Sequence, residues 1–210
     1  MPVNRKCIIR LSRYKNALQR LKALGFVKVF SDNLADAAGA TPSQVRKDFS
    51  LFGITGNRRG GYVVDELIEQ LREILGKNET QKVVLAGVGN IGRALMRYEG
   101  FGGGGISILA AFDIDPAKFD ENADIPILPL ERMHDFISEN DVKIGILSVP
   151  DVAAQQVSEL MQAAGIKGIL NFAPIQLRGD DGAIINSINL EVELENLIYF
   201  VNAAKKGVKE

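Results

Sequence analysis

The sequence predicts an α/β protein in which an N-terminal winged helix-turn-helix domain is followed by a Rossmann-like, doubly wound parallel sheet and a C-terminal helix. Up to residue 76, apolar residues recur at the spacing of amphipathic helices, whereas from Lys82 apolar strands alternate with helices. Residues 1–80 hold 14 Lys and Arg against 8 Asp and Glu, and residues 81–210 hold 11 against 18. A basic part joined to an acidic part indicates two modules, of which the basic one suits a polyanion. We therefore expect domains at 1–80 and 81–188 and a C-terminal helical segment at 189–210.

The composition is that of a water-soluble globular protein, with 46% hydrophobic and 24% charged residues. The sequence has no run of about 18 apolar residues, and its basic N-terminal segment lacks the apolar region and cleavage site of a signal peptide. A single cysteine, Cys7, excludes an internal disulfide and a cysteine-based metal cluster. We expect a cytoplasmic protein with no membrane span and no metal site.

Two short helices joined at a glycine follow the first helix and predict a helix-turn-helix. The apolar residues of 10–24 recur at helical spacing, and Gly25 ends that first helix. Ser31 or Asp32 can cap the first short helix, and Gly39 breaks it.

The second short helix begins with a strong capping signal. Thr41 is predicted to cap it, Pro42 takes the first helical position, and Gln44 completes a capping box with Thr41. The glycine-rich segment 54–64 that follows predicts a hairpin. Three helices followed by a hairpin predict a winged helix.

Polar and basic side chains on the second short helix and on the hairpin tip suit DNA. In a helix-turn-helix, the N-terminal part of the second helix enters the major groove, where lysine can bind guanine and glutamine can pair with adenine. Two adjacent arginines on a slim, glycine-rich tip suit a narrow, electronegative minor groove. The alternative for the residues of this helix is that they form a solvated polar face without DNA contacts. Arg46 either reads a base edge or binds a phosphate. The candidate DNA contacts are Ser43, Gln44, Arg46, Lys47, Arg58 and Arg59.

The alternation of strands and helices after residue 81 predicts a parallel sheet with helices on its faces. The predicted strands are 82–87, 106–113, 142–150 and 165–174, and the predicted helices are 90–98, 151–165 and 190–206.

Gly87, Gly89 and Gly92 form a G-x-G-x-x-G motif between the first strand and the helix after it. In dinucleotide-binding folds, the first glycine permits a tight turn, the second lets the pyrophosphate approach the backbone, and the third lets the helix pack closely. Asp113 ends the next strand, 21 residues after Gly92, where a carboxylate binds the adenosine ribose and repels a 2′-phosphate. Asp115, in the following turn, is the alternative ribose ligand. The motif together with Asp113 favours NAD(H) over NADP(H). The alternative to a dinucleotide site is that the glycines serve only a tight turn between strand and helix.

Two further strands end at the same edge of the predicted sheet, where ligands bind in such folds. Their ends, SVP (148–150) and NFAP (171–174), either line the cofactor or are turns set by proline. Together with the motif, they give a candidate cofactor set of Gly87, Val88, Gly89, Asn90, Ile91, Gly92, Asp113, Ser148, Val149, Pro150, Asn171 and Phe172.

The sequence offers no obvious proton-transfer group beside this site, which a hydride-transferring enzyme needs. The only histidine, His134, lies in a predicted helix remote from the strand ends, and no Tyr-x-x-x-Lys pair is present. About 130 residues beyond the linker leave no room for a substrate domain. We therefore expect no catalytic residues. A compact NAD-dependent oxidoreductase and a regulator that binds coenzyme A or another nucleotide are the alternatives.

The chain resembles the Rex family of redox-sensing transcriptional repressors along essentially its whole length. The resemblance rests on six stretches taken together and in order. They are QVRKDFSLFG (44–53), RRGGY (58–62), REILG (72–76), GVGNIGRAL (87–95), AFDIDP (111–116) and AGIKGILNFAP (164–174).

The resemblance implies a homodimer that exchanges its C-terminal helices (about 190–205) and binds a palindromic operator through the winged helix. It also implies that NADH binding to the Rossmann domain changes the angle between domains and releases DNA, while NAD+ competes without releasing it. By the same resemblance, Arg46 and Lys47 contact DNA and Arg58 enters the minor groove. Tyr98 matches a tyrosine that takes part in the redox-linked switch.

Three positions depart from the pattern of the family. Asn16 stands where some members carry arginine, and Asn189 where many carry aspartate. An ion pair between such positions would favour one domain arrangement, whereas two asparagines can only hydrogen-bond. Arg59 replaces the glycine expected beside the wing arginine, which bears on the conformation of the wing.

Overall fold

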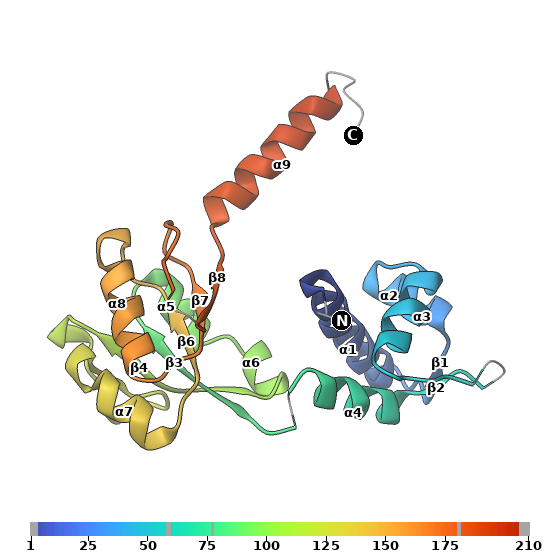
Figure 1. Cartoon of the computed structure of the whole chain (residues 1–210), viewed down its shortest axis with the longest axis horizontal. Helices are drawn as coiled ribbons and strands as arrows, with labels where there is room; N and C mark the ends of the chain where they lie inside the picture. Colours follow the sequence, from blue (N-terminus) through green and yellow to red (C-terminus); the bar gives the residue numbers. More distant parts are fainter. Residues whose placement is uncertain (1–3, 58–59, 77, 180–181, 206–210) are drawn as a thin grey trace. The chain divides into compact units, whose positions relative to one another are not determined.

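The computed structural model describes residues 4–57, 60–76, 78–179 and 182–205. The chain divides into two compact units, Met1–Glu79 and Thr80–Glu210 (Figure 1). Each unit has a hydrophobic core of its own.

The N-terminal unit is helical with a two-stranded sheet. Its elements are α1 (Arg5–Ala23), β1 (Lys28–Val29), α2 (Ser31–Ala38), α3 (Pro42–Leu51), β2 (Tyr62–Val63) and α4 (Val64–Ile74).

The small sheet of this unit differs from the hairpin that the sequence predicts. β2 pairs antiparallel with β1, which precedes the two short helices, and not with a strand at residues 54–56. Within the described part of the glycine-rich segment, one isolated bridge joins Asn57 to Gly61. Gly61 has φ +67°, and a Cβ there would lie 2.5 Å from the Val29 carbonyl oxygen, so only glycine lets the segment cross β1 this closely.

The structure confirms the predicted N-cap of the second short helix and contradicts the predicted N-cap of the first. Thr41 caps α3 as predicted, since its hydroxyl accepts the Gln44 backbone N–H at 3.2 Å. The N-cap of α2 is Phe30 instead of Ser31 or Asp32, and its backbone N–H donates to the Asn33 side chain at 3.1 Å. Asn33 therefore accepts the N–H of the cap residue itself, and the cap side chain accepts no N–H group of the first turn of α2.

The core of the N-terminal unit packs α1, α2, α3 and α4 around aromatic residues. Phe49 meets the rings of Tyr14 and Tyr62 edge to face, with centroids 5.6 and 5.2 Å apart. This packing fixes α3 against α1, so that the opposite face of α3 is left to solvent.

The C-terminal unit contains a six-stranded sheet in the order β5-β4-β3-β6-β7-β8, in which every pair is parallel. Its elements are β3 (Gln81–Ala86), α5 (Asn90–Met96), α6 (Gly100–Gly103), β4 (Ile106–Asp113), β5 (Ile127–Pro129), α7 (Met133–Asn140), β6 (Ile144–Leu147), α8 (Asp151–Ala163), β7 (Gly168–Asn171), β8 (Ile184–Ser187) and α9 (Leu190–Lys205).

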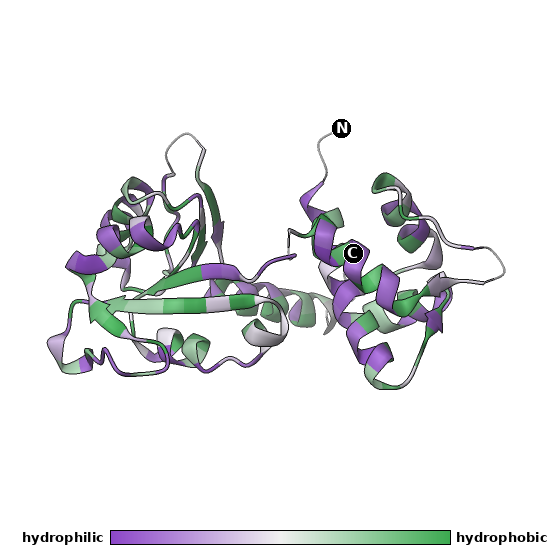
Figure 2. Cartoon of the chain, turned by 90° about the horizontal axis from the view of Figure 1, so that it is seen from below, coloured by the Kyte–Doolittle hydropathy of each residue, from purple (hydrophilic) through white to green (hydrophobic). Residues whose placement is uncertain are grey.

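Helices cover both faces of this sheet. Val84 and Ala86 belong to the core that includes α7 and α8, whereas Val83 and Leu85 belong to the core on the α5 face. Figure 2 shows the strands as largely hydrophobic, as expected for a sheet buried on both sides. The predicted fold class, a helical N-terminal domain before a Rossmann-like parallel sheet and a C-terminal helix, is confirmed. The edge strands β5 and β8 were not predicted.

The connection between β4 and β5 contains little helix. The short 3₁₀-helix Pro116–Lys118 begins it, and an isolated bridge between Asp120 and Ile127 ends it. A crossover between parallel strands usually carries an α-helix. Here the strand face next to α5 is left partly uncovered.

α9 ends the described chain and exposes large apolar side chains. Within the described residues, no helix is both long and apolar enough to cross a membrane. The exposed apolar residues of α9 are Leu190, Val192, Leu194, Leu197, Ile198, Tyr199, Phe200 and Val201.

Candidate functional site

A crevice opens at the carboxyl edge of the sheet, where the strand order reverses around β3. The loops after β3, β4 and β6 meet there, as they do at the ligand-binding edge of doubly wound sheets. They enclose a cavity of about 330 Å³. Its walls are mostly apolar and include Phe112, Ile114, Leu130, Val149, Pro150 and Ala153.

The three glycines of the motif have distinct surroundings in this crevice. Gly87 has φ +93°, and a Cβ there would lie 2.4 Å from the Ser148 carbonyl oxygen. A Cβ on Gly92 would lie 2.0 Å from the Gly87 carbonyl oxygen, so the start of α5 depends on glycine. A Cβ on Gly89 would meet no atom within 4 Å. Gly87 and Gly92 thus serve backbone packing, and Gly89 faces open space.

Asp113 ties the glycine loop to the end of β4. Its carboxylate accepts the Val88 backbone N–H at 2.7 Å and the Asp115 backbone N–H at 3.0 Å. The Lys118 ammonium donates to it at 3.0 Å. Burial raises the pKa of the Asp113 carboxyl, but the two backbone N–H groups and the ammonium outweigh burial and lower it. Asp113 is therefore a carboxylate at neutral pH, held beside the glycine loop.

The loops after β6 and β7 are ordered by polar side chains. The Ser148 hydroxyl donates to the Gly87 carbonyl oxygen at 2.8 Å, which joins the β6 loop to the glycine loop. Asn171 is fully buried, and its amide donates to the carbonyl oxygens of Ala173 and Ile175 and accepts the Ala173 N–H. The Asn171 side chain therefore holds the NFAP loop instead of facing the crevice. Phe172 is partly buried against the core on the α5 face.

The remaining cofactor candidates lie on or after α5. Asn90 and Ile91 are exposed in its first turn, next to Gly89. Tyr98 lies beyond the end of α5, where it is 60% exposed and packs edge to face on Phe101 with centroids 5.0 Å apart. A helix of this length spans about 10 Å, so the structure does not bring Tyr98 to the crevice of its own chain.

The exposed face of α3 carries the predicted DNA contacts that the structure describes. Ser43, Arg46 and Lys47 are exposed. The Arg46 guanidinium donates to the Ser31 hydroxyl at 2.8 Å and lines a groove between α2, α3 and Gly56–Asn57. The predicted wing arginines, Arg58 and Arg59, lie outside the described residues.

A buried carboxylate, Asp48, links α3 to α1, and the sequence did not reveal it. Arg10 donates to it through two nitrogens, at 2.6 and 2.7 Å, and the Tyr14 hydroxyl donates at 3.0 Å. The Gln44 side chain donates at 2.8 Å, so the predicted capping box with Thr41 is only half formed.

The hydrogen bonds to Asp48 have electrostatic consequences. Burial raises the pKa of the Asp48 carboxyl, but the hydrogen bonds, above all from Arg10, lower it below its usual value. Burial, with Asp48 as acceptor, raises the pKa of Tyr14 to about 12 and raises the pKa of the Cys7 thiol. The buried thiol therefore stays protonated and is a poor nucleophile.

Known proteins resemble the chain over most of its length. The family described as putative DNA-binding protein N-terminus matches residues 3–50, and the CoA binding domain family matches residues 78–175. The redox-sensing transcriptional repressor Rex of Desulforamulus reducens is 41% identical over 91% of this chain and 92% of its own. Rex of Pelotomaculum thermopropionicum is 42% identical over 91% of each chain. The chain belongs to the Rex family of redox-sensing transcriptional repressors.

Solved structures of a Rex-family repressor, RSP, agree with this assignment. RSP in complex with β-NAD+ and operator DNA has a TM-score of 0.90 and 34% identity over 98% of this chain and 95% of its own. RSP in complex with β-NADH has a TM-score of 0.85 at the same identity, over the whole of both chains.

Membership of the Rex family decides between the sequence-based alternatives. Its relatives are transcriptional repressors and not enzymes, so the oxidoreductase alternative is set aside. His134, the only histidine of the sequence, lies exposed on α7 beside Asp135. The CoA binding domain family matches residues 78–175 alone, whereas the Rex relatives cover 91% of the chain.

Proposed function

We propose that this protein binds palindromic operator DNA through its N-terminal unit and releases it when NADH binds at the crevice of the Rossmann-like sheet. The observation that carries the proposal is the presence in one chain of a crevice of about 330 Å³ beside an open glycine loop and of an exposed basic face on α3. The relative RSP, solved with operator DNA and with either form of the dinucleotide, supports it.

The crevice suits a nicotinamide dinucleotide in a definite orientation. The loop Gly87–Gly92 and the exposed N–H groups of Asn90 and Ile91 would hold the pyrophosphate at the start of α5. Asp113 would accept hydrogen bonds from the adenosine ribose, and the apolar wall at Val149 and Pro150 would pack on adenine. Ser148 and Asn171 would act by shaping these loops.

The nicotinamide end would provide the discrimination between NADH and NAD+. The ring is neutral in NADH and cationic in NAD+, so an apolar surrounding disfavours the oxidised form by desolvation. Phe172, together with an exchanged C-terminal helix, would supply that surrounding, and each tenfold preference needs about 1.4 kcal/mol.

For DNA, the proposal assigns different tasks to the residues of α3. Lys47 and Ser43 project from the exposed face and would reach base edges or phosphates, and Arg46, beside the start of α2, would bind a phosphate. Gln44 keeps one side-chain N–H and its carbonyl oxygen for a base, because its other N–H is donated to Asp48. Arg58 and Arg59 remain proposed minor-groove contacts.

We also propose a cytoplasmic homodimer with a DNA-binding domain at 1–80, a cofactor domain at 81–188 and a dimerisation helix at 189–210. The exposed apolar side chains of α9 support dimerisation, because monomeric soluble proteins rarely leave such a surface to water. The Asn189 side chain accepts the Glu191 and Val192 backbone N–H groups and so caps α9.

A reduced, buried Cys7 is compatible with the cytoplasm. Tyr98 is kept as a switch residue that would act across the dimer.

The proposal is tested with a duplex that the protein selects from a random pool. Fluorescence anisotropy at constant salt follows the complex while NADH, NAD+ or coenzyme A is added. We expect NADH alone to release the duplex, because only NADH favours the state in which the paired recognition helices no longer match the DNA.

The variant Asp113→Ala tests whether the NADH response depends on the proposed ribose ligand. It removes the carboxylate at the ribose end, so it should weaken the NADH response and leave the affinity for the duplex largely intact. Equal release by NADH and NAD+, or release by coenzyme A alone, would contradict the proposal.

A further inference from the structure

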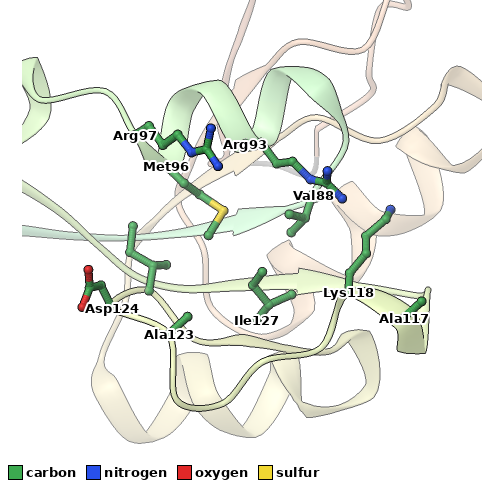
Figure 3. A pocket seen from close by; sticks show the side chains of 10 residues that line it. Val88, Arg93, Met96, Arg97, Ala117, Lys118, Ala123, Asp124 and Ile127 are labelled. Atoms are coloured by element: carbon green, nitrogen blue, oxygen red, sulfur yellow. The ribbon is translucent and has the colours of Figure 1, made fainter.

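A second cavity lies on the α5 face of the sheet, separate from the crevice. It measures about 590 Å³ and is bounded by α5 on one side and by the β4–β5 connection on the other (Figure 3). Its floor is apolar, with Val88, Met96, Ile125 and Ile127, and three basic side chains surround it, those of Arg93, Arg97 and Lys118.

The cavity exists because the β4–β5 connection is mostly loop. After the 3₁₀-helix Pro116–Lys118, the chain runs through residues 119–126 without a helix that would cover Met96 and Ile127. Partly exposed apolar side chains, those of Met96, Ile125 and Ile127, therefore stand beside basic groups, a combination found in small-molecule sites.

The charges around this cavity are unbalanced and locally unfavourable. Arg97, the C-cap residue of α5, lies four residues after Arg93, and like charges at this spacing destabilise a helix by about 0.2–0.5 kcal/mol. Among the described residues, neither guanidinium has an ion pair, and Asp124 is the one carboxylate that lines the cavity. Residues 81–210 hold 11 basic against 18 acidic residues, so three basic groups at one cavity run against the charge of the unit.

We propose that this cavity is a second ligand site, which binds a nucleoside monophosphate. The two guanidinium forks hold the phosphate, since they match a phosphate in geometry and charge, and Lys118 adds a third positive group. The partly exposed side chains of Met96, Ile125 and Ile127 take the base, for which a flexible thioether is an adaptable contact.

Lys118 connects this second site to the crevice. It lines both cavities, and its ammonium donates to the Asp113 carboxylate at 3.0 Å and lies 4.0 Å from that of Asp115. A phosphate at the second site competes with Asp113 for this ammonium. Because Asp113 is the proposed ribose ligand, the phosphate ligand changes the affinity for NADH; this last step rests on the proposed function.

The test uses AMP as the probe and the full chain, with calorimetric titrations in the absence of NADH and at saturating NADH. We expect AMP to bind the NADH-saturated protein without displacing NADH. In the double variant Arg93→Gln/Arg97→Gln, AMP should bind at least about tenfold more weakly, a loss of about 1.4 kcal/mol. The matched control Arg178→Gln removes an exposed arginine elsewhere in the same unit and should leave AMP binding unchanged. Adenosine should bind much more weakly than AMP.

Other outcomes would overturn the proposal. AMP affinity that is the same in the double variant as in the wild type would show that the arginines hold no phosphate. Displacement of NADH by AMP would place AMP in the crevice, and inorganic phosphate that binds as tightly as AMP would remove the role of the floor. A titration with NADH alone tests the proposed function, and a titration of the NADH-free protein with AMP tests the second site. The two proposals can therefore fail independently.

Discussion

Replacing Asp48 by alanine is expected to destabilise the N-terminal unit by about 3–5 kcal/mol and to abolish tight operator binding. The Asp48 side chain is only 1% exposed and accepts the bidentate bond from Arg10, whose own side chain is 27% exposed. Without Asp48, a partly buried guanidinium, the Tyr14 hydroxyl and the Gln44 amide lose their acceptor at once. Because these bonds hold α3 to α1, the face of α3 proposed to contact DNA loses its support.

The measurement combines denaturation of the full chain with hydrogen exchange of peptides from α1 and α3, which reports on this unit alone. The matched control is Asp65→Ala, because Asp65 pairs with Lys22 at 2.7 Å while both side chains are more than half exposed. An exposed pair contributes at most about 1 kcal/mol. Equal losses in the two variants would contradict the structural role given to Asp48.

The proposed homodimer is expected to dissociate into monomers when lysines replace Leu194 and Leu197 of α9, and operator binding is expected to weaken by about 10²–10⁴-fold. Leu194 and Leu197 are 57% and 59% exposed and lie on one stripe of α9 with Leu190 and Val201. A dimer buries such a stripe, and a charge introduced into an apolar interface must be desolvated without a partner. A monomer then binds a single half-site without the gain from linked binding.

Analytical ultracentrifugation and operator titration measure the two effects of Leu194→Lys/Leu197→Lys. The control is Glu195→Lys, which introduces the same charge at a polar position of the same helix. We expect the Glu195→Lys control to remain dimeric. A monomeric wild type, or a double variant that stays dimeric and binds the operator normally, would refute the proposed role of α9.

The regular elements of the fold were predictable because their patterns are local. The long helices α1 and α8 and the buried strands β3 and β4 follow from the local pattern of apolar residues. The short strands were missed for a physical reason: β5 has three residues and ends in Pro129, and β1 has two, so neither is long enough to show a pattern. The pairing of β1 with β2 joins residues more than 30 positions apart, which no local pattern reports.

Site residues that lie close together in the sequence could be predicted, whereas those brought together only by packing could not. The glycine motif and Asp113 could be recognised from spacing. The bonds from Arg10 and Tyr14 to Asp48 span 38 and 34 residues, and in sequence Asp48 is an ordinary polar helix residue. The structural task of Asn171 and the second cavity at Arg93 arise only once loops are placed in space.

The central claim is that the NADH site and the DNA site are coupled, and the affinity for NADH with and without operator tests it most directly. Linkage requires each ligand to weaken the other by the same factor, which for typical coupling is about 5–150-fold. NADH fluorescence titrations of the free protein and of the protein saturated with a selected operator duplex measure that factor at constant salt. We expect operator to weaken NADH binding by the same factor by which NADH weakens operator binding. An NADH affinity that is the same in both titrations would contradict it.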